Sequence, residues 1–158
     1  MKILAIDPGP DQSAWVRYDP AKRAVGDKGI SPNDQLVGFL RHHGGKGRTT
    51  LAVEMVQSFG MPVGESVFET VLWAGRFVEA WDGYWTRIYR KDVKMHLCHS
   101  MRAKDANIRQ ALLDRFPRSG GGKTPQVGVK ADPGPLYGIR THLWSALAVA
   151  ITAAETRE

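Results

Sequence analysis

The first residues of the chain constrain the fold most strongly, because a short apolar run stops at an acidic residue. Residues 3–6 read Ile-Leu-Ala-Ile, and Asp7-Pro8-Gly9 follows directly. Such a run predicts a buried strand, and Pro-Gly predicts the turn that ends it. Asp7 is therefore expected at the end of a buried strand, where a fold can hold a divalent cation. The alternative is an aspartate that only starts a turn, a common use of Asp-Pro-Gly.

Hydrophobic periodicity and turn residues predict five strands and five helices in the rest of the chain. The expected strands are residues 3–7, 13–18, 24–30, 50–56 and 84–89, and the expected helices are 31–42, 64–81, 91–99, 104–116 and 141–155. Ser31-Pro32 is expected to cap and open the first helix. Residues 117–135 combine Gly and Pro with short polar residues and predict a mobile loop. This order predicts an α/β fold with a mixed five-stranded sheet flanked by helices.

Length and composition favour a single domain that spans residues 1–158. The single cysteine, Cys98, excludes an internal disulfide and a multi-cysteine zinc site. No apolar run approaches the roughly 20 residues of a membrane span. Met1-Lys2 leads directly into the first expected strand, which predicts a chain without a signal peptide. We therefore expect a soluble, reduced, cytoplasmic protein.

The charge balance favours a polyanionic partner. The chain has 22 Lys and Arg against 16 Asp and Glu, a net charge of +6. Aromatic residues between positions 81 and 89 lie among basic ones, a mixture that suits unpaired or distorted DNA or RNA. A merely basic soluble protein with these aromatics in its core is the alternative. The candidate nucleic-acid contacts are Lys46, Arg48, Arg102, Lys104, Arg109 and Lys123.

Two further polar residues lie in segments that are otherwise apolar. Glu54 lies within the expected strand 50–56, and His142 lies in the first turn of the final helix. A buried charge needs a cation, a partner or the end of the sheet. One metal site shared by Asp7, Glu54 and His142 would explain all three, and these ligands suit Mg²⁺ or Mn²⁺ more than zinc. Alternatively, Glu54 could pair with an arginine such as Arg76, and His142 could cap its helix or donate to a backbone carbonyl.

Taken in order, these motifs resemble the RuvC-type Holliday junction resolvases of the ribonuclease H-like superfamily, and especially their small phage-encoded relatives. Residues 3–9 resemble the family's first strand with its catalytic aspartate, and residues 52–54 resemble the strand with its catalytic glutamate. Residues 102–109 resemble the basic entry to a family helix, and residues 142–150 resemble the final helix. The resemblance spans nearly the whole chain in the family's order.

The resemblance implies a ribonuclease H-like fold and a Mg²⁺-dependent endonuclease, for which Mn²⁺ could substitute. Asp7 would bridge two metal ions, and Glu54 and His142 would each hold one. His142 could instead orient the water or act as an acid or base. The family usually has an aspartate three residues after the position of His142, where this chain has Ser145. Asp132 or a water molecule could supply the missing ligand.

The resemblance also implies a homodimer, because a four-way junction has two-fold symmetry and needs two cuts. The apolar helix at 64–81 is the expected dimer interface. Phe59 is the nearest candidate for the aromatic wedge that the family places after its glutamate, although its spacing differs. The implied partner is branched DNA, met during recombination and repair in the cytoplasm of a bacterial or phage-infected cell.

Two other functions stay open at this point. A ribonuclease H-like nuclease could act on RNA or on another DNA structure, because one fold serves many substrates. A catalytically silent nucleic-acid-binding module is also compatible with the sequence, because Ser145 is a poor metal ligand.

Overall fold

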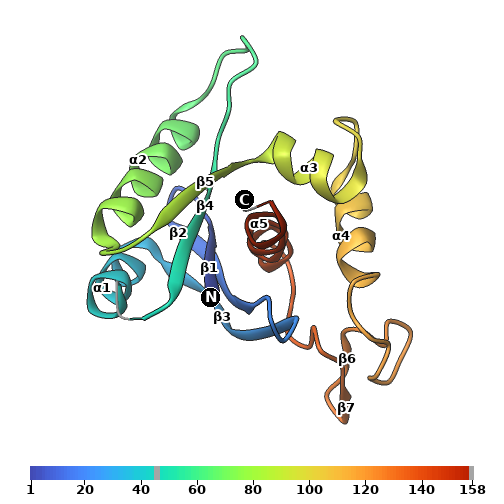
Figure 1. Ribbon diagram of the computed structural model, residues 1–158. Helices are drawn as coiled ribbons and strands as arrows, with labels where there is room; N and C mark the ends of the chain where they lie inside the picture. Colours follow the sequence, from blue (N-terminus) through green and yellow to red (C-terminus); the bar gives the residue numbers. More distant parts are fainter. Residues whose placement is uncertain (45–46, 157–158) are drawn as a thin grey trace.

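A mixed five-stranded sheet organises the part of the chain that the computed structural model describes, residues 1–44 and 47–156 (Figure 1). The strands are β1 (Lys2–Asp7), β2 (Gln12–Asp19), β3 (Ala24–Pro32), β4 (Thr49–Met55) and β5 (Trp85–Tyr89). Their order in the sheet is β3-β2-β1-β4-β5. β1, β2 and β3 are antiparallel neighbours, whereas β4 is parallel to β1 and β5 is parallel to β4. The predicted mixed five-stranded sheet is confirmed.

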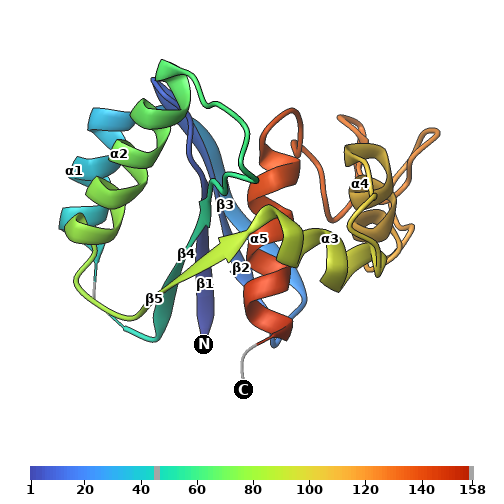
Figure 2. The ribbon, with the colours of Figure 1, turned by 90° about the horizontal axis from the view of Figure 1, so that it is seen from above.

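Helices cover both faces of this sheet (Figure 2). They are α1 (Asn33–His43), α2 (Glu65–Ala80), α3 (Arg90–Cys98), α4 (Asp105–Leu113) and α5 (Leu143–Glu155). α1 and α2 lie on one face and α5 lies on the other, with α3 and α4 beyond it. α5 is buried over most of its length, as its apolar sequence predicts. No helix within the described residues is both long enough and apolar enough to cross a bilayer.

The pairing of β1 with β4 brings two acidic residues to the same level of the sheet. The parallel register places Ile6 opposite Val53, so Asp7 and Glu54 follow side by side where both strands end. The residues two positions earlier on each strand belong to the core on the α5 side. Because side chains alternate between the two faces of a strand, Asp7 and Glu54 are directed to that same side.

A buried polar network fixes the turn that follows Asp7. Asn33 donates from Nδ2 to the Gly9 carbonyl at 2.9 Å, and the Ser13 hydroxyl donates to Asn33 Oδ1 at 2.6 Å. The Gly9 amide donates to the Ser13 hydroxyl at 3.1 Å, and the Asn33 amide donates to the Asp11 carbonyl at 3.0 Å. Each polar atom in the network has a partner, which is what burial requires. The network therefore joins the start of α1 to the turn after β1.

Three predicted helix boundaries are wrong. α5 begins at Leu143 and not at residue 141, so His142 is the N-cap residue before the helix and does not lie in its first turn. α1 begins at Asn33, because Ser31 and Pro32 continue β3 and pair with β2. The Ser31 hydroxyl accepts a hydrogen bond from Trp15 Nε1 at 3.0 Å instead of capping the helix. α4 ends at Leu113, three residues before the predicted end. Residues 114–116, which were predicted to belong to the helix, form the turn after it. A Ser-Pro pair is also compatible with an edge strand, where proline needs no donor.

The segment predicted as a mobile loop is folded into a hairpin. β6 (Gly128–Val129) pairs antiparallel with β7 (Asp132–Pro133). The Gly121 amide donates to the Asp132 carbonyl at 2.9 Å, which ties the preceding chain to the hairpin. Gly128 has a φ of +75°, and the backbone of residues 132–134 lies so close to it that a side chain at this position would clash. Strands of two residues show no periodicity, so the sequence pattern indicated only the turns.

We predict that Asn33→Ala lowers the free energy of unfolding by about 2–3 kcal/mol, because the buried Ser13 hydroxyl loses its acceptor and the half-buried Gly9 carbonyl loses its donor. Urea unfolding followed by circular dichroism measures the change. Asn107→Ala is the control, since Asn107 is exposed and its side chain accepts one bond, from the Lys104 amide. Equal losses for the two variants would show that the buried network contributes no more than an exposed cap.

Candidate active site

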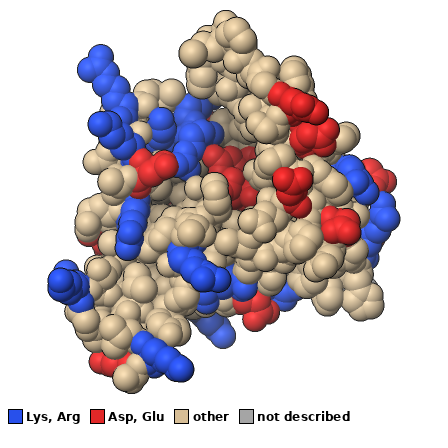
Figure 3. Space-filling model, turned by 180° about the vertical axis from the view of Figure 1, so that it is seen from behind, with Lys and Arg blue, Asp and Glu red and all other residues tan. Residues whose placement is uncertain are grey.

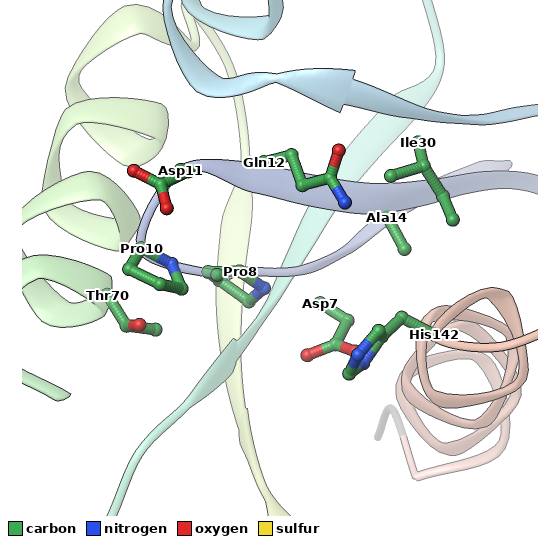
Figure 4. A pocket seen from close by; sticks show the side chains of 10 residues that line it. Asp7, Pro8, Pro10, Asp11, Gln12, Ala14, Ile30, Thr70 and His142 are labelled. Carbon is green, nitrogen blue, oxygen red and sulfur yellow. The ribbon is translucent and has the colours of Figure 1, made fainter. Parts of the chain in front are cut away.

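Asp7 and His142 meet where β1 ends and α5 begins (Figure 4). His142 Nδ1 lies 3.1 Å from Asp7 Oδ2. An ionised carboxylate only accepts, so Nδ1 donates and Nε2 is left as the free ring nitrogen. The His142 side chain is 78% exposed and that of Asp7 is 15% exposed. The His142 side chain makes no capping bond to its helix, so the structure places it with Asp7 rather than with a backbone carbonyl.

Glu54 lies beside Asp7 and faces a different arginine from the one considered in the sequence. Arg90 Nη1 lies 3.8 Å from Glu54 Oε1. Arg76 instead places its guanidinium 4.2 Å from the centre of the Trp73 ring. Glu54 Oε2 is buried and has no hydrogen-bond partner among the described residues. Glu54 therefore has one distant ion pair and one buried oxygen without a hydrogen bond in its ionised form, and its carboxyl group can donate to Asp7 when it is protonated.

Burial and mutual repulsion govern the charges of the two carboxyl groups. Burial raises the pKa of Asp7, and the neighbouring His142 opposes this rise. Burial, and next the negative charge of Asp7, raise the pKa of Glu54 to about 8, which Arg90 only partly opposes. Two carboxylates close together in a buried place cannot both ionise cheaply without a cation. The site is thus electrostatically prepared for a positive ligand.

The donor set fits a hard divalent cation in its chemistry. Asp7 and Glu54 offer carboxylate oxygens, which Mg²⁺ and Mn²⁺ prefer, and His142 offers an imidazole nitrogen. The buried, unpartnered Glu54 Oε2 is the observation that favours such a ligand. Within residues 1–44 and 47–156, however, no three His, Cys, Asp or Glu side chains stand close enough together to form a metal cluster. Asp7 and Glu54 are the residues that would hold the ion, and His142 is the adjacent donor.

Arg90 and Asp105 complete the site, although sequence analysis did not assign either to it. Arg90 is the first residue of α3 and forms an ion pair through Nη2 with Asp105 Oδ1, at the start of α4. The strand register contains a signal for Arg90, because Ile88 lies opposite Glu54 and residue 90 follows on the same face. This signal appears only once β4 and β5 are known to be neighbours.

Three hollows lie next to one another and share these residues. Asp7 and His142 line the first, which has a volume of about 380 Å³ and is drawn in Figure 4. Asp7, Glu54 and Arg90 line the second, of about 220 Å³. Arg90 and Asp105 line the third, of about 300 Å³. Asp7 is therefore the wall between the first two hollows, and Arg90 is the wall between the last two.

The two residues proposed for the missing ligand position lie on different elements. Ser145 is half-buried on α5 and lines the third hollow with Arg90 and Asp105. Asp132 is exposed on β7 and lies beside Gly121 within the hairpin. The hairpin fold that the sequence did not predict is the physical reason for the distant position of Asp132.

The predicted nucleic-acid contacts occupy different parts of the surface. Phe59 is 69% exposed and lines the second hollow, next to Glu54. Arg109 lines the third hollow, with its guanidinium 4.8 Å from the centre of the Trp144 ring. Arg48 precedes β4 and lies at the end opposite Glu54, apart from the site. Three of the predicted contacts are exposed and line none of the three hollows: Arg102, Lys104 and Lys123. Lys46 lies outside the described residues.

The space-filling view shows how charge is distributed on the face of the molecule that is turned away from the viewer in Figure 1 (Figure 3). Acidic side chains lie in a recess, and Lys and Arg side chains gather on the α3 and α4 side of it. A recessed negative centre with a basic flank can hold the phosphate backbone on the flank and a cation in the recess.

Comparison with solved structures finds proteins with a similar fold. The structure is similar to that of Thermus thermophilus RuvC, with a TM-score of 0.60 and 18% sequence identity, covering 98% of this chain and 93% of that one. The chain has a RuvC-like fold. RuvC of the same organism in complex with a Holliday junction substrate matches with a TM-score of 0.59, 19% identity and coverage of 98% and 92%. No family model and no curated protein matches the sequence.

At this identity the likeness to RuvC shows the ribonuclease H-like fold and no more. The predicted fold class is thereby confirmed, with the sheet and helices in the arrangement described above. The particular resemblance to phage-encoded relatives of RuvC stays a prediction.

We predict that the metal-free protein loses stability as the pH rises from about 5 to 9. Glu54 has a pKa of about 8 in the folded chain against 4.5 for the unperturbed group, so its protonated form stabilises the fold. That contribution is complete below the lower value and is lost as the pH rises through the higher one. Calorimetric melting temperatures in the presence of a chelator, at several pH values, measure the loss.

Glu54→Gln is expected to flatten this pH dependence, because the amide does not ionise. Glu69→Gln, on the exposed side of α2, is the matched control and should keep the wild-type slope. If Glu54→Gln and the wild type lose melting temperature in parallel, Glu54 is not the group that titrates.

Proposed function

We propose that this chain, as one nuclease domain of 158 residues, is a metal-dependent endonuclease that hydrolyses phosphodiester bonds in branched DNA. The observation that carries the proposal is the in-register pair of buried carboxylates, Asp7 and Glu54, in a RuvC-like fold. Such a pair at the ends of neighbouring strands suits metal-assisted hydrolysis. We further propose Holliday junctions as the substrate, since the similar RuvC structure is a complex with one.

In this proposal each residue of the site has its own role. Asp7 and Glu54 would hold Mg²⁺ or Mn²⁺, which would activate the attacking water and stabilise the leaving oxygen. His142 uses Nδ1 for Asp7, so its Nε2 is the atom that could orient that water or accept its proton. Phe59 and Arg109, which line the neighbouring hollows, would contact the DNA next to the cleaved bond.

We propose that the active protein is a homodimer formed through α2. Phe68 and Leu72 are 63% and 57% exposed on this helix, one turn apart. Val71 adds a further exposed apolar side chain, and nothing in the described chain lies within 4 Å of a side chain placed at Gly75. An apolar helix face next to a glycine suits close contact with a second helix. Two copies related by two-fold symmetry would match the symmetry of a four-way junction.

A catalytically silent nucleic-acid-binding module is the second candidate. It is favoured by the serine at position 145, which is a poor metal ligand, and by the lack of a group of three His, Cys, Asp or Glu side chains within the described residues. A nuclease that acts on RNA hybrids or on another DNA structure would use the same site. Cleavage assays on four-way, flap, hybrid and linear substrates, with and without Mg²⁺ or Mn²⁺, distinguish these functions.

We predict that Asp7→Asn and Glu54→Gln each reduce junction cleavage at least about 100-fold while DNA affinity changes little. Catalysis depends on an ion held by the two carboxylates, whereas binding depends on many dispersed cations. Single-turnover cleavage and gel-shift titration measure the two effects. Asp132→Asn is the control and should cleave at the wild-type rate. Near wild-type cleavage by either carboxylate variant would remove that residue from the proposed site.

We predict that Leu72→Glu converts the dimer to a monomer, because it places a charge in the apolar face of α2. Light scattering after gel filtration at micromolar concentration measures the mass. Met95→Glu is the control, since Met95 is 46% exposed on α3 and lies outside the proposed interface. A monomeric wild type with full junction cleavage would rule out the dimer.

A further inference from the structure

Arg90 places a fixed positive charge inside the acidic site. Its Nη1 lies 3.8 Å from Glu54 Oε1, and its Nη2 is paired with Asp105. Nη1 is buried and has no hydrogen-bond partner among the described residues. A guanidinium always carries its charge and offers donors in a planar fork that matches phosphate oxygens. Asp105 therefore holds one side of this fork, while the other side faces Glu54 and has hydrogen-bonding capacity that no described residue uses.

The backbone around Arg90 is well anchored. Arg90 directly follows β5, whose Ile88 lies opposite Glu54, and it begins α3. The Tyr89 amide donates to Asp92 Oδ2 at 3.1 Å, which closes the first turn of the helix. Arg90 is thus fixed at its backbone by β5 and α3 and at its tip by Asp105. A side chain fixed at both ends has little entropy to lose on contact with a ligand.

The formal charges around Arg90 balance one divalent cation. Asp7, Glu54 and Asp105 contribute three negative charges and Arg90 contributes one positive charge, so these four groups together carry a net charge of minus two. Lys91 and Arg109, which also line the second and third hollows, lie outside this count and add further positive charge at the rim. Ser145, on the wall of the third hollow, adds no charge. Before DNA binds, a second divalent ion would leave these groups with an excess of two positive charges, next to the buried Nη1 of Arg90. Coulomb repulsion at such short range is strong in a partly buried site.

We propose that this site holds a single divalent metal ion, bound by Asp7 and Glu54, and that the Arg90 guanidinium serves as the second cation, contacting the phosphate of the cleaved DNA. Asp105 is the positioning residue that holds Arg90. This inference rests on the proposed function, which it deepens. A preorganised cation placed where negative charge develops stabilises a transition state without reorganisation of solvent.

The number of Mn²⁺ ions that bind to the chain tests the proposal without any assay of activity. Mn²⁺ is titrated into the wild type alone and with a four-way junction, and electron paramagnetic resonance counts the bound ions, with a DNA blank subtracted. One ion per chain without coupling between Mn²⁺ spins is expected. A spin-coupled pair of ions in the wild type would overturn the proposal, because ions roughly 4 Å apart are the alternative.

Variants of Arg90 test its charge. Arg90→Gln should bind Mn²⁺ roughly tenfold more tightly, or bind a second ion, because a repelling charge is gone. Its junction cleavage should fall about 100-fold. Arg90→Lys keeps the charge, and Arg87→Gln removes an exposed charge from β5, the strand that precedes Arg90, so both should stay within about twofold of wild-type Mn²⁺ affinity. Equal Mn²⁺ affinity for Arg90→Gln and Arg87→Gln would overturn the proposal.

Asp105 variants test the positioning role. Asp105→Asn should lower kcat about tenfold and leave KM and the Mn²⁺ count unchanged, and Asp105→Glu should restore most of the rate. The failure of the two proposals can be told apart. Junction cleavage by a wild type with two coupled ions would refute the role of Arg90 and keep the endonuclease. One bound ion with a tighter Arg90→Gln, but no cleavage of any substrate, would refute the endonuclease and keep the charge role of Arg90.

Discussion

The parallel pairing of β1 with β4 is the contact on which the rest of the site depends. It runs in register from Lys2 and Thr49 to Ile6 and Val53, and the next residue on each strand is acidic. The fold thereby holds two carboxylates side by side on a rigid sheet, with both directed to the α5 face. A shift of one residue in either strand would turn its carboxylate to the opposite face, against the core under α1 and α2.

Placing two carboxyl groups side by side in a largely buried position disfavours their ionised forms, and the surrounding helices partly offset this effect. Burial and the proximity of Asp7 favour the neutral form of Glu54 and raise its pKa to about 8. His142, at the start of α5, and Arg90, at the start of α3, each supply a donor or a positive charge to one of the two carboxyl groups. α5 and α3 thus begin next to Asp7 and Glu54, the two carboxyl groups whose negative charges need a partner. Sites whose charges are balanced only by a ligand are common at functional centres.

The sequence predicted those parts of the structure that depend on local pattern. The apolar run before Asp7, the acidic residue within the fourth strand and the apolar final helix each have a clear period or composition, and each was placed correctly within about two residues. The interaction of Arg90 with Glu54 and Asp105 could not be predicted, because it joins three elements whose neighbours are set by the sheet order. The β6–β7 hairpin was missed for a related reason, since its strands are too short to show alternation.

The position of Arg90 also gives a physical reason why Ser145 is compatible with a working site. A carboxylate at position 145 would face the hollow that already contains Asp105 and the Arg90 guanidinium. There it would compete with Asp105 for Arg90, or it would add a negative charge that needs a further cation. A hydroxyl adds neither, so Arg90 stays beside Glu54 with its unpartnered nitrogen available. A guanidinium cannot activate water as a metal ion does, so the proposed hydrolysis would still require one divalent cation. In the proposed site, Arg90 would thus take the place of a second metal ion, and Ser145 would take the place of the acidic ligand that such an ion needs.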